Sequence, residues 1–441
     1  MTGMPSGDPD DSERLERGRL YGFRAFHQPG FRIYFVGMLF RGMAMWMPLV
    51  AIPWLSVELG ATPGEIGIIS AAFFLPTLFI GPMSGVLADR VERRSVLVVA
   101  QVAASGLAAL LALLIVAGQQ TLTLLAIMSF IFGFIVAVEV PVRQAFMTEL
   151  IPQRDIPSAI SLHAAAWTTA RLVGPVLAGV MIATIGPASP FIFGAVISLV
   201  VAASIVWMDR YREPGRQRSD RSHSVFEDMR EGASFALRDP VVRWSVFLLW
   251  TVAMFGIATF TTLAPIFAPQ ELGLGADGFG AFLGASGAGA LTAALLVTAF
   301  AHGDRRPWLL AAVLAMAALV ASLAVVQNVY LALVVAFLLG AAQVTLGQNA
   351  AVSVQSATPD ALRGRVTGIW VMTFQAASLF GAILSGWLAD VVGVRGALFA
   401  GAMALALVAL VAVVALRRAE WHLRPVGLAG TPMMGQADSS T

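Results

Sequence analysis

The chain has 441 residues, of which 58% are hydrophobic and only 12% are charged, and its mean hydropathy is +0.80. A soluble domain carries about a quarter of its residues as charged side chains, so this composition excludes an ordinary soluble protein and indicates a chain embedded in lipid. The net charge of +2 comes with no clustered basic face for nucleic acid, and zero Cys excludes disulfides, thiol catalysis and Cys-ligated zinc.

Residues 1–30 are acidic and then basic, and they lack the apolar core and small-residue cleavage site of a signal peptide. We expect them to form a cytoplasmic tail. Two interpretations stay open for this segment. It forms an amphipathic helix on the membrane surface, or it has no regular structure; the helix would present Leu15, Leu20, Phe23 and Phe26 to the lipid.

Twelve apolar runs follow, each close to the ~20 residues that a helix needs to cross a bilayer. They lie at 31–56, 64–88, 95–117, 121–142, 158–183, 189–208, 242–268, 276–301, 307–326, 329–354, 366–389 and 396–416. The sequence therefore predicts an all-α membrane protein with twelve transmembrane helices in two six-helix bundles. The expected parts are a tail (1–30), a bundle (31–208), a polar central loop with an amphipathic segment (209–241), a second bundle (242–417) and a C-terminal tail (418–441).

Arginine supplies all 28 basic residues, and its distribution predicts the orientation of the chain. Loops and tails on the side of the N-terminus hold 25 of them, the opposite loops hold Arg395 alone, and Arg41 and Arg171 lie within spans. Loops on the cytoplasmic side of a membrane carry the excess of basic residues. Both termini and the central loop are therefore expected in the cytoplasm.

An internal repeat supports the division into six plus six helices. Three glycines and one proline of the first half recur 207 residues later, as the pairs Gly133 and Gly340, Pro152 and Pro359, Gly174 and Gly381, and Gly179 and Gly386. All of these residues lie in the fourth span, the fifth span or the loop between them, in each half. Two parallel halves related by an axis along the membrane normal describe the architecture of the major facilitator superfamily (MFS).

Two arginines lie at membrane depth, where charge is costly and usually functional. Arg41 is in the first span and Arg171 in the fifth, and no Asp or Glu shares their level in the predicted spans. Their partners are therefore either an anionic group of a substrate or neutral polar groups. We regard both arginines as candidates for substrate binding, together with the polar or aromatic residues Gln343, Gln375 and Trp46.

The loop after the second span, "GVLADRVERRS", concentrates charge between two apolar runs. Gly85 and Asp89 are four residues apart and share one helix face. The stretch resembles the MFS signature after helix two, with Glu92 in place of the usual glycine. The resemblance implies that Gly85 lets helix two approach helix eleven. It also implies that Asp89 forms a latch with the N-terminus of helix eleven. The loop's arginines either join this latch or only anchor the loop: Arg90, Arg93 and Arg94.

The segment from the fourth to the fifth span resembles the MFS branch of the enterobactin exporter and the transmembrane secretion effectors. The matching residues are Glu139, Pro141 and Arg143, and then Ala170, Arg171, Gly174 and Pro175. With Gly179, the latter run approximates the MFS antiporter motif, which favours export over import. The alternative is a proline kink in helix five that carries no directional meaning.

Glu139 admits two roles. It is the candidate partner of Arg93 in the cytoplasmic gate, together with Arg143, and it is also a possible proton carrier beside His163. The gate role is the preferred hypothesis. The sequence does not reveal how transport is energised, so protons are considered only as a possible coupling ion.

The sequence predicts a monomeric secondary active transporter of the plasma (inner) membrane that exports an amphipathic drug, siderophore or secondary metabolite by alternating access. Its expected partners are this small molecule and membrane lipid. No enzyme activity, cofactor, metal or nucleic acid is expected. The alternatives are an importer or a lysophospholipid or lipid transporter of the same fold, and a membrane scaffold that transports nothing.

Overall fold

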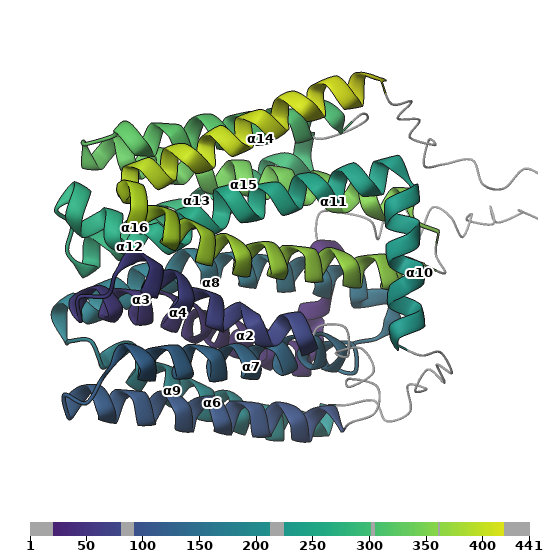
Figure 1. The fold of residues 1–441 in the computed structure, drawn as a ribbon. Coiled ribbons are helices and arrows are strands. Elements are labelled where there is room, and N and C mark those ends of the chain that lie inside the picture. Colours follow the sequence, from purple (N-terminus) through teal and green to yellow (C-terminus); the bar gives the residue numbers. More distant parts are fainter. Residues whose placement is uncertain (1–20, 81–91, 212–224, 301–304, 360–361, 419–441) are drawn as a thin grey trace, which may run out of the picture.

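The computed structural model describes residues 21–80, 92–211, 225–300, 305–359 and 362–418. In these ranges the chain folds into long helices that lie side by side, with no strand (Figure 1). The first half contains η1 (Tyr21–His27), α2 (Pro29–Trp46), α3 (Pro48–Glu58), α4 (Pro63–Ile80), α6 (Arg93–Val116), α7 (Leu122–Met147), η3 (Gln153–Asp155), α8 (Ile156–Thr184), α9 (Ser189–Met208) and η4 (Asp209–Tyr211).

The second half begins with a helix that lies across the ends of the others (Figure 1). Its elements are α10 (Val225–Arg238), α11 (Pro240–Val252), η5 (Ala253–Ala258), α12 (Thr259–Leu272), α13 (Ala276–Phe300), α14 (Arg306–Val325), α15 (Val329–Ala357) and α16 (Arg363–Arg418). We call the end of the molecule where α2 begins and α16 ends the terminal face, and the opposite end the far face.

Eleven of the described segments are long and apolar enough to cross a membrane. The last of them runs over 51 residues, which is about 75 Å of helix and more than twice the bilayer core of ~30 Å. It is broken at Gly393, where φ is 78° and ψ is 165°. Glycine has no Cβ to clash in this conformation. The chain turns back there, so α16 supplies two crossings and the twelve predicted crossings are confirmed.

Two crossings are irregular near their middle, and these are the first of each half. The first consists of α2 and α3, joined at Met47 immediately before Pro48, which lacks the backbone N–H that a continuous helix needs. The first crossing of the second half contains η5, a π-helical segment over Ala253–Ala258 between α11 and α12. Such segments are rare and are frequent at functional sites.

The two halves form two bundles, which meet mainly along two pairs of helices. In the first half α2 packs on α8 and α9, and α6 packs on α7 and α9; in the second, α13 packs on α15 and α14 on α16. The most extensive contacts between the bundles are those of α8 with α13 and of α4 with α16, and α12 also packs on α3 and α4. Figure 1 shows the first half in purple and blue on one side, and the second in green and yellow on the other.

The α8–α13 and α4–α16 contacts rest on glycines. A methyl group added at Gly280 of α13 would lie 2.9 Å from Cα of Gly179 on α8, and one at Gly386 of α16 would lie 3.1 Å from Cα of Gly67 on α4. The helix backbones therefore touch, which only small residues allow. Gly179 of α8 and Gly386 of α16 are 207 residues apart, and their partners Gly67 and Gly280 are 213 residues apart.

The same offsets recur inside each bundle. Gly133 of α7 packs on the backbone of Phe73 in α4, and Gly340 of α15 packs on the backbone of Ser286 in α13. The glycines are again separated by 207 residues and their partners by 213 (73 to 286). The repeat seen in the sequence is therefore a repeat of helix contacts, and the two bundles are built on one plan.

The segment around α10 carries a local core of its own. Ala236 of α10 is buried with Val242, Val354 and Val366, which come from α11, α15 and α16. Asp239 then caps α11 by accepting a hydrogen bond from the backbone N–H of Val242 at 2.9 Å. The next crossing therefore begins at Pro240, two residues before the predicted start at 242. The division of the chain into domains at 208/209 and 241/242 stays a prediction.

Candidate functional site

A cluster of ionised side chains is buried inside the first bundle, centred on Glu139 of α7. Its carboxylate accepts hydrogen bonds from Arg41 of α2, at 2.5 Å from Nη2 to Oε2 and 3.2 Å from Nε to Oε1. Oε1 also accepts from Nη1 of Arg143 at 2.7 Å and from Nε2 of Gln101 at 2.8 Å. Glu139 and Gln101 are each 1% exposed, and the arginines no more than 7%. Two cations share one carboxylate, so the cluster carries a net charge of +1.

This cluster corrects two expectations. We expected no carboxylate at the level of Arg41, yet Glu139 pairs with it. The error comes from the end of the fourth crossing, because α7 continues to Met147 rather than ending at 142. Glu139 is thus about 12 Å from the end of α7, and Arg41 about 18 Å from the start of α2. The long arginine side chain spans the remaining difference.

The second correction concerns Arg93, for which Glu139 was the candidate partner. Nη1 of Arg93 instead lies 2.6 Å from Oε1 of Glu149, which follows the end of α7 at the terminal face. Arg94 lies 3.4 Å from Asp209 at the same face. Gly85, Asp89 and Arg90 lie outside the described residues, so the latch between Asp89 and helix eleven stays a prediction.

Arg171 of α8 reaches across to the other bundle. One guanidinium nitrogen donates a hydrogen bond to the side-chain oxygen of Gln343 on α15. Its guanidinium carbon lies 5.8 Å from the ring centroid of Trp46 on α2, and Trp46 in turn packs edge-to-face on Trp167 at 6.2 Å. Three of the five predicted substrate-binding residues therefore lie together at the junction of the bundles, while the fourth, Gln375, lies half-buried on α16.

The two arginines at membrane depth thus have different surroundings. Arg41 is 5% exposed, and its charge is paired within one bundle. Arg171 is half-buried, and the described residues give it a neutral amide and an aromatic ring as partners. Of the two, Arg171 has the unneutralised charge that an anionic group would pair with. A role in substrate binding stays a prediction for both residues.

The residues predicted to kink helix five are contact points. Gly174 packs on Trp46 and on the backbone of Met43 in α2, and the carbonyl of Pro175 faces Gly280 of α13. Helix α8 continues through Pro175 to Thr184. The tight packing expected of these small residues is therefore present, since Gly179 also touches α13.

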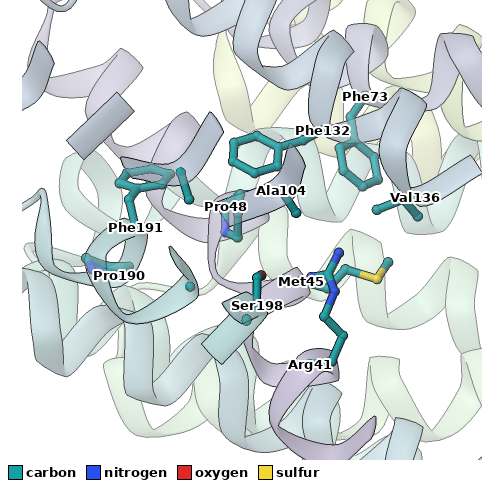
Figure 2. Close-up of a pocket in the computed structure, with 13 residues that line it drawn as sticks. Arg41, Met45, Pro48, Phe73, Ala104, Phe132, Val136, Pro190, Phe191 and Ser198 are labelled. Atoms are coloured by element: carbon teal, nitrogen blue, oxygen red, sulfur yellow. The ribbon is translucent and has the colours of Figure 1, made fainter. Parts of the chain in front are cut away.

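A small pocket lies within the first bundle, beside Arg41 (Figure 2). Aromatic and aliphatic side chains line most of it, and it has room for about one water molecule. Drug-sized ligands occupy pockets of roughly 300–1,000 Å³. This pocket is therefore too small for such a substrate, and the residues at the junction of the bundles remain the better candidates.

Sequence reasoning missed Gln101, a member of the buried cluster, and Tyr34, the partner of His163. Gln101 is an isolated polar residue in an apolar span, a signal that points to an internal partner. Tyr34 of α2 and His163 of α8 share a hydrogen bond of 3.0 Å between the phenol oxygen and Nδ1. The position of His163 beside Tyr34 gives this imidazole a structural partner within the bundle.

Comparison with known proteins places these features in context. A family model described as a transmembrane secretion effector matches residues 21–427. The chain is 26% identical over 398 residues to the multidrug efflux pump Tap of Mycolicibacterium fortuitum, covering 87% of this chain and 94% of that protein. It is 23% identical over 407 residues to the uncharacterized MFS-type transporter YfiS of Bacillus subtilis (strain 168), covering 89% and 95%.

Solved structures agree on the fold. A bacterial homolog to the human lysosomal transporter Spinster, in an inward-facing and unoccupied conformation, aligns with a TM-score of 0.69 at 13% identity, covering 91% of this chain and 98% of that chain. The nucleoside transporter NupG aligns with a TM-score of 0.66 at 13% identity, covering 89% and 100%. At this identity the likeness shows the architecture of two helix bundles.

Proposed function

Because the chain belongs to the transmembrane secretion effector family of the major facilitator superfamily, we propose that it exports an amphipathic small molecule by alternating access. The chain is an integral membrane transporter and not an enzyme. Export is favoured because a relative similar over 94% of its own length is a multidrug efflux pump. Beyond membership of this family, we propose the direction of transport, which is export, the class of cargo and the mechanism.

The observation that carries the proposal is the contact of Arg171 with Gln343 between the bundles. A cation that faces a neutral amide forms a weaker interaction than one that faces a carboxylate. A cargo with an anionic or strongly accepting group competes for Arg171 and separates the two side chains. Trp46, within cation–π distance of the same guanidinium, offers the apolar part of the cargo an aromatic surface.

The packing between the bundles supports alternating access. The α8–α13 and α4–α16 contacts depend on backbone approach at Gly179 with Gly280 and at Gly67 with Gly386, near the far face. At these glycines the helices meet through their backbones, with few interlocking side chains, so the bundles can separate there with little rearrangement of side chains; Trp54 of α3 on Phe279 of α13, with ring centroids 5.6 Å apart, is an aromatic contact across the same junction. Rocking about a site at the depth of Arg171 then exposes this site to one face at a time.

The experiment is efflux from proteoliposomes, across a panel of amphipathic compounds that are anionic, neutral or cationic, with and without an imposed pH gradient. We expect the wild-type chain to move anionic members fastest. Arg171→Gln should lower the rate for these members by about tenfold or more, because a charge-assisted hydrogen bond contributes ~1.5–3 kcal/mol. The rate for neutral members should change little.

The matched control is Arg238→Gln, which removes an exposed arginine in the last turn of α10, away from the junction. This variant should transport like the wild type. Equal losses for all three charge classes in Arg171→Gln would assign Arg171 to structure rather than selectivity. A pH gradient that leaves the rate unchanged would exclude protons as the coupling ion, and no movement of any compound would favour a scaffold.

A further inference from the structure

A carboxylate of the second bundle lies on the start of a helix of the first, at the far face. The backbone N–H of Gly64, in the first turn of α4, donates to both carboxylate oxygens of Asp390 on α16, each at 3.1 Å. The two residues are 326 positions apart in the chain. The N-terminus of a helix carries a partial positive charge, so the contact is electrostatically favourable.

Helix α4 does not need this carboxylate as a cap. Thr62 and Glu65 already form a capping box, in which Glu65 accepts from the N–H of Thr62 at 2.8 Å and Thr62 Oγ1 accepts from the N–H of Glu65 at 3.3 Å. The contact of Asp390 with Gly64 is therefore additional to the local capping. Its consequence is to tie the first bundle to the second.

The Asp390 carboxylate lies one helical turn beyond a glycine contact between α16 and α4. Gly386, one helical turn before Asp390, packs on the carbonyl of Pro63 at 2.5 Å and on Cα of Gly67 at 3.1 Å, measured from the position of an added methyl group. Gly386 lets α16 approach α4, and Asp390 then reaches the exposed N–H of the same first turn. The glycine and the aspartate are four residues apart, so they share one face of α16.

The same residues recur elsewhere in the sequence. Gly386-Trp-Leu-Ala-Asp390 repeats the pattern of Gly85-Val-Leu-Ala-Asp89, which follows α4. Helices α4 and α16 are neighbours, and α4 starts at the face toward which the first arm of α16 runs. Asp89 lies outside the described residues, and the argument for Asp390 stands on its own contacts.

The nearest basic side chain in sequence is engaged elsewhere. Nε of Arg395 lies 2.6 Å from Oε2 of Glu271, and its other nitrogens donate to the carbonyls of Ala324 and Val326 at 3.0 and 3.2 Å. All of these partners belong to the second half. Asp390 is exposed, so its interaction with the start of α4 is partly screened by solvent and of moderate strength.

We propose that Asp390 is a positioning residue that latches the far face shut: its carboxylate holds the start of α4 against α16, and its release accompanies opening of that face. The latch would be the far-face counterpart of the one that the resemblance to the MFS signature predicts for Asp89. Moderate strength suits this task, because cargo binding must be able to shift the balance between open and closed states.

The test measures opening of the far face directly. The chain has no cysteine, so two cysteines can be introduced without a background, at the exposed positions Gln119 and Gln327. These lie in far-face connections of the first and second bundle. Spin labels at both sites, measured by double electron–electron resonance in lipid nanodiscs, report the distance between the bundles at that face. The measurement needs no substrate, so it is independent of the proposed function.

Asp390→Asn removes the charge, and we expect the ratio of the long-distance to the short-distance population to rise about two- to fivefold, as for loss of a charge at a helix terminus. Asp390→Glu keeps the charge and should stay within about twofold of the parent. Gly64→Ala should open the far face as well, because its methyl group would collide with the Asp390 carboxylate while leaving the charge in place.

The control is Glu58→Gln, which neutralises an exposed carboxylate of the same face that accepts a hydrogen bond from Nε1 of Trp54 on the same helix. It should not change the distance distribution. The proposal is overturned if Asp390→Asn and Gly64→Ala both leave the distribution as in the parent, or if Glu58→Gln shifts it as far as Asp390→Asn does. If the aspartate variants fail to fold, the distance distribution of Gly64→Ala tests the proposal by itself.

Discussion

At the scale of single residues, the buried carboxylate of Glu139 dominates the first bundle. It accepts four hydrogen bonds from two arginines and a glutamine, and it is 1% exposed. The contribution of such a cluster to the free energy of unfolding depends on whether all of its members are present. The complete group is roughly neutral for stability, whereas removal of one partner leaves uncompensated charge in a low-dielectric interior. Because Glu139 is the only anion among these partners, it is the member whose loss costs most.

We therefore expect Glu139→Gln to destabilise the protein by ~3–5 kcal/mol, because Arg41 and Arg143 would then be buried without a counter-charge. The measurement is the thermal unfolding midpoint of the purified protein in detergent. Glu231→Gln is the control, since Glu231 pairs with Arg365 at the surface and its side chain is 57% exposed. An exposed pair contributes ~0–1 kcal/mol. Equal shifts of the midpoint in both variants would contradict the assignment.

At the scale of helices, the first crossing of each half is irregular where it faces a glycine of a neighbour. Gly174 of α8 packs beside the join of α2 and α3, and Gly381 of α16 packs on Met254 and Ala258 of η5. A break in the regular hydrogen-bond ladder is a place where a helix bends at low cost. These joints therefore lie at equivalent places in the two bundles, where rocking has to be accommodated.

The glycine crossing of α8 and α13 leads to a prediction at this scale. Gly280→Val should reduce transport at least tenfold, because the Cβ would lie 2.6 Å from the carbonyl oxygen of Pro175 and would force the helices apart. The measurement is the efflux rate in proteoliposomes at equal protein content.

The matched control is Gly106→Val on α6, where an added Cβ meets nothing within 4 Å. Both substitutions place the same residue in a helix, so the difference in helix propensity cancels between them. Gly106→Val should stay within about twofold of the wild type. Comparable losses in both variants would mean that the effect comes from the valine itself and not from the crossing.

At the scale of the whole molecule, the chain is a pair of bundles of one plan, and in its described residues glycine contacts and two polar contacts at different depths join them. The deeper polar contact is that of Arg171 with Gln343, and the one at the far face is that of Asp390 with Gly64. Neither is a buried ion pair. Contacts of this kind separate more easily than a buried salt bridge, which suits a carrier whose bundles rock.

The orientation of this assembly is open to a direct test. The excess of arginine at the terminal face predicts that this face is cytoplasmic. In intact cells, a membrane-impermeant maleimide should label Gln119→Cys, which lies at the far face, and should label Gln153→Cys, between α7 and α8 at the terminal face, only after permeabilisation. Both are exposed glutamines in a chain without cysteine. The reverse pattern would place the termini outside.

Much of the architecture follows from the sequence alone. Apolar runs near twenty residues determine the crossings. In lipid, only α-helices and closed β-barrels satisfy all the hydrogen-bonding groups of the backbone. The glycine repeat determines the two-bundle plan, since a glycine recurs where a backbone must pass closely. These signals are local along the chain, and each can be recognised within a few dozen residues of the sequence.

The charge pairs were decided only by the tertiary structure. Whether Arg41 meets Glu139 depends on where two helices end and how they are turned, to within one helical turn, and hydropathy places helix ends less closely than that. The same holds for the contact of Asp390 with Gly64, across 326 residues of chain. Lipid dictates which segments cross the membrane, while packing between helices distant in sequence decides which side chains meet.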